Sequence, residues 1–64
     1  MPAARHIEGP ILELRPPRSR FLYVIKGRRI IVLVALRKQK GETPPREIKL
    51  AFRRLAEVER REAE

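Results

Sequence analysis

The stretch RFLYVIKGRRIIVLVALRKQK, residues 20–40, decides the fold, and it contains no acidic residue. Its second half holds seven consecutive apolar residues, Ile30 to Leu36, rich in β-branched side chains. This run is too short to cross a bilayer, and its composition favours a strand that is apolar on both faces. Gly27-Arg28, just before it, fits a two-residue turn with glycine where positive φ is needed. The preceding segment alternates and has two distinct faces: Phe21, Tyr23 and Ile25 on one, and Arg20, Leu22, Val24 and Lys26 on the other. The stretch therefore predicts an antiparallel β-hairpin.

A third strand is predicted just before the hairpin, over residues 10–15 (PILELR). Leu12 and Leu14 alternate there with Ile11, Glu13 and Arg15, which is typical of a short half-buried strand. Two prolines at 16–17 end it, because proline donates no ladder hydrogen bond and restricts the residue before it. Strands at 10–15, 20–26 and 29–36 then form an antiparallel meander. Residues 1–9 show no periodicity and are expected to be loosely ordered, with His6 on the surface.

One helix is predicted towards the C-terminus. The segment Thr43-Pro44-Pro45-Arg46-Glu47 has the features of a helix start, with threonine as the N-cap and glutamate in the first turn. Either proline could be the first helical residue. An apolar stripe at spacings of three and four follows: Ile48, Ala51, Phe52, Leu55 and Val58. We therefore predict a helix over 44–62 and, over residues 1–64, one small α+β domain in which a three-stranded antiparallel β-meander precedes a C-terminal helix.

This fold leaves one face of the sheet uncovered. The strand at 29–36 is apolar on both sides, whereas the chain supplies a single helix. An exposed apolar face invites aggregation, and a symmetric partner subunit would cover it. We therefore predict a homo-oligomer.

Charge is distributed unevenly along the chain. The net charge is +8, residues 15–40 hold nine basic residues and no acid, and all but two of the eight glutamates lie at Glu42 or later. Such a basic block on a sheet is typical of a protein that binds a polyanion, which predicts RNA or the ribosome as partner. The alternative is that the charge maintains solubility and protects the sheet's edges. The predicted RNA-binding residues are Arg18, Lys26, Arg28, Arg29, Arg37 and Lys40.

The composition also excludes several classes of site. The chain has no cysteine, no aspartate and one histidine, which excludes disulfides and most metal sites and catalytic triads. No metal or cofactor is predicted. There is no signal-peptide pattern or transmembrane run, so the expected compartment is the cytoplasm.

Several short motifs in order carry a resemblance to a known family. They are Glu13-Leu14-Arg15, Arg20-x-x-Tyr23, the apolar strand ending in Leu36, the basic Lys38, and Thr43-Pro44-x-x-Glu47-Ile48-x-x-Ala51. Over residues 8–56 this order resembles the C-terminal two-thirds of the RelE/HigB toxin superfamily, specifically its phage-derived HigB-like branch. The resemblance implies a truncated RelE-like fold and the toxin of a bacterial type II toxin–antitoxin system. Such toxins cleave mRNA on the ribosome without a metal, and a small helix-turn-helix antitoxin neutralises them.

The resemblance also implies roles for four residues. Arg15 and Arg20 would bind phosphate and stabilise the transition state, Lys38 would contact the backbone or aid proton transfer, and Tyr23 would stack on a base or transfer a proton. The alternatives are a solvated sheet face for the two arginines and a core position for Tyr23.

The chain also departs from the family pattern. Family members carry a strand and a helical hairpin before the segment that matches residues 13–15, and the aromatic and paired lysines after their apolar strand stand here as Leu36 and Lys38-Gln39. These departures predict weakened or absent ribonuclease activity. Two alternatives therefore stay open: a non-catalytic module that binds RNA or the ribosome, and a self-associating interaction module.

Overall fold

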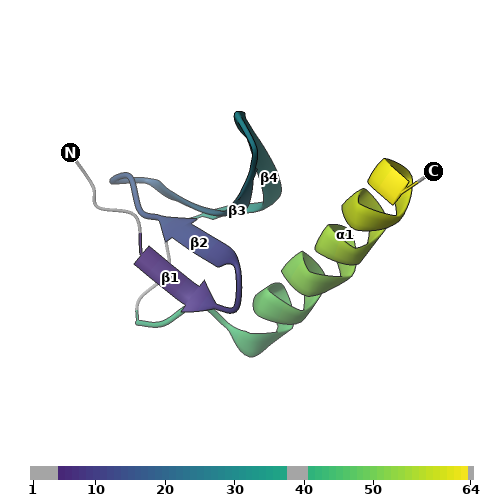
Figure 1. The fold of residues 1–64 in the computed structure, drawn as a ribbon. Coiled ribbons are helices and arrows are strands. Elements are labelled where there is room, and N and C mark those ends of the chain that lie inside the picture. The colour runs from purple at the N-terminus through teal and green to yellow at the C-terminus, as the bar shows by residue number, and fades with distance from the viewer. Residues whose placement is uncertain (1–4, 38–40, 64) are drawn as a thin grey trace.

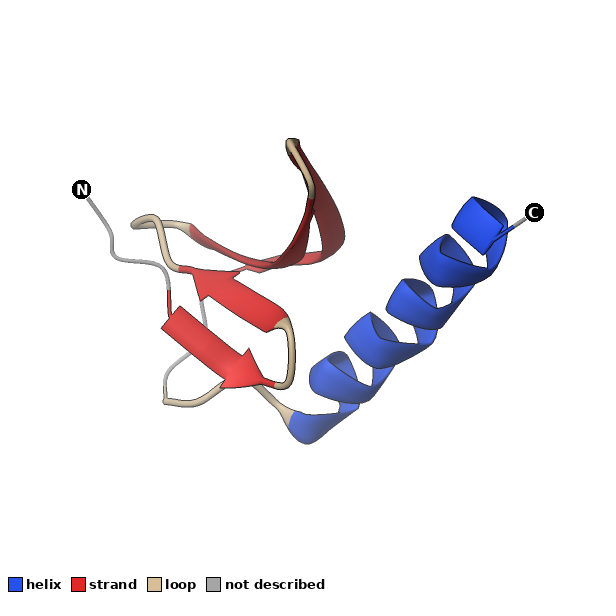
Figure 2. Ribbon diagram, in the orientation of Figure 1, coloured by secondary structure: helices blue, strands red, loops and turns tan. Residues whose placement is uncertain are grey.

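The computed structural model describes residues 5–37 and 41–63, which form one antiparallel sheet and one helix (Figures 1 and 2). The elements are β1 (Arg5–Glu8), β2 (Ile11–Leu14), β3 (Ser19–Lys26), β4 (Arg29–Arg37) and α1 (Pro45–Ala63). The strands lie in the order β1-β2-β3-β4, and each is antiparallel to its neighbours. The α+β class, the meander order and the single C-terminal helix are as predicted. In the described part of the chain, no helix is both long and apolar enough to span a membrane.

The strand count differs from the prediction, because four strands are present instead of three. Residues 5–8, expected to be loosely ordered, form β1 and pair with β2 through Arg5↔Glu13 and His6↔Leu12. Gly9, with φ of 55°, makes the sharp turn between the two strands. The segment RHIE lacks the alternating apolar pattern by which a strand is recognised in a sequence. Its extended conformation therefore depends on pairing with β2.

The β3–β4 hairpin agrees closely with the sequence. Lys26 pairs with Arg29 across the two-residue turn, and Gly27 has φ of 61°, as the first position of a type II′ turn requires. Further along, Leu22 pairs with Val34 and Tyr23 with Val32, which leaves Leu33 as the extra residue of a β-bulge. A bulge bends its strand, and Figure 1 shows this hairpin curling away from β2. Arg54 of α1 donates a hydrogen bond to the Leu33 carbonyl at 2.7 Å and so ties the helix to the bulge.

The core lies between α1 and one face of the sheet. Its buried members come from all elements except β1: Ile11, Leu22, Val24, Leu33, Val34, Ala51 and Leu55. In β2 the pairing sets Leu12 opposite Tyr23 and Leu14 opposite Phe21, on the face away from the helix. The residues of β2 that point towards the helix and are buried are therefore Ile11 and Glu13.

The helix starts one residue later than the earlier of the two predicted positions. It begins at Pro45, and the Pro44 carbonyl accepts backbone hydrogen bonds from Glu47 at 3.0 Å and Ile48 at 3.4 Å. Proline suits the first helical position, because its missing N–H would have no partner there. The Thr43 hydroxyl, expected to cap the helix, is instead bonded to two side chains of the sheet.

Candidate nucleic-acid interface

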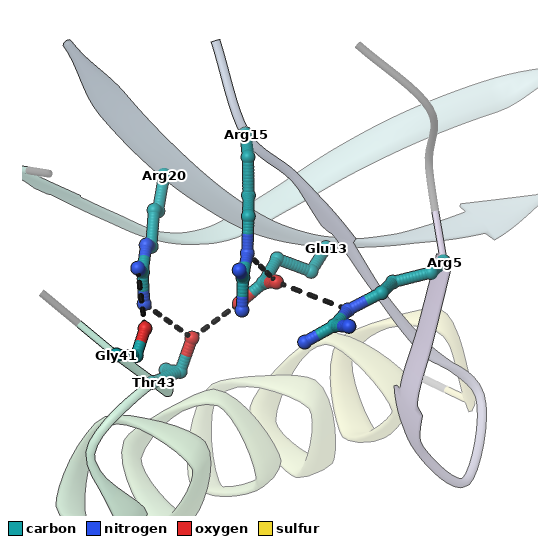
Figure 3. Close-up of polar contacts among 6 residues, drawn as sticks. All are labelled: Arg5, Glu13, Arg15, Arg20, Gly41 and Thr43. Carbon is teal, nitrogen blue, oxygen red and sulfur yellow. Dashed lines mark hydrogen bonds and ion pairs between the residues drawn. The ribbon is translucent and has the colours of Figure 1, made fainter. Parts of the chain in front are cut away.

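Glu13 is the centre of a polar cluster that lies between the sheet and the start of α1 (Figure 3). Its side chain is fully buried. One carboxylate oxygen, Oε1, accepts a hydrogen bond from Arg15 Nε and lies 3.5 Å from Arg5 Nε. The other oxygen, Oε2, accepts a hydrogen bond from the Thr43 hydroxyl. Glu13 thus joins β1, the end of β2 and the segment before the helix.

The partners of Glu13 keep its carboxylate ionised. Burial raises the pKa of Glu13, but the hydrogen bonds from Thr43 and Arg15 and the charges of Arg15 and Arg5 lower it by more. The net result is a pKa below the ordinary value of 4.5. A buried carboxylate with these partners carries a structural negative charge at neutral pH and is poorly suited to exchange protons with a substrate.

Arg20 lies beside this cluster on the same side of the sheet, and its side chain is buried. Its guanidinium donates a hydrogen bond to the Gly41 carbonyl at 2.6 Å and another to the Thr43 hydroxyl at 3.4 Å. Thr43 therefore bridges Arg20 and Glu13 (Figure 3). This differs from the solvated sheet face that was one alternative for Arg20, because the side chain anchors β3 to the segment that leads into α1.

Of the four residues proposed for catalysis, the structure brings two together. Arg15 and Arg20 both lie in the Glu13 cluster. Tyr23 lies on the opposite face of β3, where it lines a shallow apolar hollow of about 270 Å³ with Leu14, Phe21, Ile30 and Val32. Lys38 lies outside the described residues.

Comparison with known protein families gives a match over most of the chain. Residues 1–56 match the family described as phage-derived protein Gp49-like (DUF891). The chain belongs to this family. Gp49-like proteins are related to the RelE/HigB toxins of toxin–antitoxin systems. No curated protein matches the chain.

The other basic residues proposed to bind RNA in this Gp49-like protein fall into two groups. Arg18 and Arg37 are exposed at the end of the sheet near Arg15 and Arg20, since Ser19 pairs with Arg37. Lys26, Arg28 and Arg29 lie at the other end of the β3–β4 hairpin, about 23 Å away at the rise of a β-strand. Arg29 is also paired there with Glu62 at 3.4 Å. Lys40 lies outside the described residues.

Two residues of the Glu13 cluster were missed by the sequence reasoning. The sequence predicts a loosely ordered segment around Arg5, and it indicates Glu13 only as part of a strand motif. A signal for Glu13 was present, because it is the one acidic residue between Gly9 and Gly41, directly before the basic block. An isolated carboxylate in a strand beside several arginines indicates a buried ion pair. For Arg5 the sequence offers no comparable signal, since its position depends on β1–β2 pairing.

Proposed function

We propose that this Gp49-like protein is the toxin of a type II toxin–antitoxin pair and that it acts on mRNA at the ribosome. The relation of its family to the RelE/HigB toxins supports the class. The observation that supports the RNA target is the gathering of Arg5 and Arg15 on the single carboxylate of Glu13, with Arg20 joined to it through Thr43. Two guanidinium groups, those of Arg5 and Arg15, against one carboxylate leave an excess of positive charge, which a polyanion can neutralise.

Cleavage of RNA by its own 2′-hydroxyl needs electrostatic stabilisation of the phosphorane and proton transfer at two oxygens. In this proposal Arg15, whose side chain is 37% exposed, supplies positive charge to the phosphate. Arg20 maintains the local structure through Thr43 and Gly41. Lys38 remains the candidate for proton transfer.

A second candidate is binding to RNA or the ribosome without cleavage. One observation favours it: three of the described groups that could transfer a proton, those of Glu13, Tyr23 and His6, are not available to the arginine cluster. Glu13 is buried and bonded to its partners, Tyr23 lies on the opposite face, and His6 pairs with Leu12 on that same face. Tight binding by the cluster alone would still inhibit translation.

The test compares the wild type, Arg15→Gln and Arg53→Gln in a reconstituted translation reaction, with mRNA cleavage mapped by primer extension. Arg53 is exposed on α1, so Arg53→Gln matches the loss of charge away from the cluster. Ribosome-dependent cleavage that Arg15→Gln abolishes and Arg53→Gln retains supports the nuclease. Inhibition without cleavage supports the binding candidate. No inhibition by the wild type, together with RNA affinity that does not change with salt, contradicts both.

The proposed toxin also requires an antitoxin. We expect a neighbouring gene for a small helix-turn-helix protein, whose product should form a complex with this chain and relieve the inhibition. Co-expression of the two proteins with affinity capture of one checks this. A neighbouring protein that neither binds nor relieves inhibition would argue against the toxin assignment.

A further inference from the structure

Arg5 and Arg15 contact the same oxygen of Glu13 from two neighbouring strands. The Nε of each guanidinium faces this oxygen. The carboxylate is fully buried, whereas the Arg5 and Arg15 side chains are 57% and 37% exposed. The anion is thus inside the protein, and both cations extend from it towards solvent.

This arrangement leaves donors available for a second anion. A guanidinium has five N–H groups in a planar fork, and the bond through Nε uses one of them. Among the described residues, the side chains of Arg5 and Arg15 make no hydrogen bond or ion pair other than those with Glu13. The pair therefore has one uncompensated positive charge and several outward N–H groups, which match the oxygens of a phosphate.

We infer that Arg5 and Arg15 together bind one phosphodiester group of single-stranded RNA, and that Glu13 is the positioning residue that holds them side by side. The inference rests on the proposed function, in that the chain must bind RNA. Two free guanidinium groups would repel each other and sample many rotamers. The shared carboxylate offsets this repulsion and restricts the rotamers in the free protein, and such preorganisation favours binding.

The test of Glu13 is whether removal of its charge tightens or weakens RNA binding. Glu13→Gln and Glu42→Gln both raise the net charge from +8 to +9. Glu42 is exposed and close in sequence to the cluster, so Glu42→Gln is a matched control. If Glu13 only offset positive charge, its removal would tighten RNA binding as Glu42→Gln does. If it positions the arginines, Glu13→Gln weakens binding by about fivefold or more despite the added charge.

The measurement is fluorescence anisotropy of a labelled short single-stranded RNA, titrated with each variant over a range of salt. Circular dichroism establishes that Glu13→Gln is folded. Equal affinity of Glu13→Gln and Glu42→Gln, with a wild type that binds, overturns the inference and leaves the proposed function intact. A wild type that does not bind RNA contradicts the proposed function, and the inference with it.

Arg5 gives a second test that does not depend on the folding of Glu13→Gln. Arg5→Gln and Arg53→Gln each remove one charge from an exposed side chain. Arg5→Gln should reduce the slope of log affinity against log salt by about 0.7, the value for one phosphate contact in a single strand. Arg53→Gln should leave the slope near that of the wild type. Equal slopes for the two variants exclude Arg5 from the phosphate site.

Discussion

The two faces of the sheet differ in a way that reverses the usual arrangement of a small domain. The face under α1 contains the buried charges of Glu13 and Arg20 together with the apolar core. The face away from α1 is almost uncharged, and Ile25, Ile30 and Val32 are 57%, 68% and 54% exposed there. The charges are tolerated inside because each has partners. The apolar side chains outside have no cover within the described chain, so this second face is where we expect a partner.

The largest expected effect is the complete loss of self-association through the exposed face of the sheet. Its centre carries no charge, so two chains of net charge +8 can meet there without opposing like charges directly. We expect a dimer, and Val32→Lys should abolish it by placing a cation in the middle of the interface. Sedimentation at micromolar concentration checks both. A wild type that sediments only as a monomer rules out self-association.

A large difference in stability loss is expected between apolar substitutions on the two faces of the sheet. Leu22→Ala removes a fully buried side chain and should cost about 2–5 kcal/mol of unfolding free energy. Ile30→Ala, on the exposed face, should change the unfolding free energy of the monomer by about 0.5 kcal/mol or less. Urea unfolding at low protein concentration measures both. Similar losses for the two variants would mean that Ile30 is buried in solution.

An intermediate effect is expected when the bridge between Glu13 and Arg20 is removed. Thr43→Val keeps the size of the side chain but deprives the buried carboxylate of a hydrogen-bond donor, which should cost about 1–3 kcal/mol. Thr43→Ser retains the hydroxyl and should therefore keep most of the unfolding free energy that Thr43→Val loses. Urea unfolding of the three proteins decides the matter. Equal stability of Thr43→Val and Thr43→Ser would show that the hydroxyl is unimportant.

A smaller loss of stability is expected when the pH is lowered. The pKa of Glu13 is lower in the folded chain than its ordinary value of 4.5, so the ionised form stabilises the fold. That stabilisation is present above pH 4.5 and is lost as pH falls through the lower folded-state pKa. Urea unfolding between pH 7 and pH 3 should therefore show a steeper loss for the wild type than for Glu13→Gln. Parallel curves would exclude Glu13 as a source of the acid sensitivity.

The sequence was most informative where structure is local. The β3–β4 hairpin, its Gly27 turn and the helix follow from alternation, turn chemistry and an apolar stripe, all within neighbouring residues. β1 was missed because it depends on pairing with β2, and the RHIE segment has no pattern of its own. Which side of β2 faces the helix also depends on register, and so did the burial of Glu13.

The candidate site was predictable only in part for the same reason. Arg15 and Arg20 were identified and do lie in one cluster, but their partners Arg5, Gly41 and Thr43 come from distant parts of the chain. The placement of Tyr23 and Arg20 on opposite faces of the sheet could be predicted from the sequence. Residues three apart on a strand point to opposite faces, and a shared motif does not change that.

The Glu13–Thr43 hydrogen bond also constrains when the arginine cluster can exist. It joins residues 30 positions apart, whereas Arg15 is two positions from Glu13. Closing the longer loop has the larger entropic cost. While the chain is being synthesised, Arg15 and Arg20 emerge well before Thr43. The complete cluster can therefore form only after translation has passed Thr43.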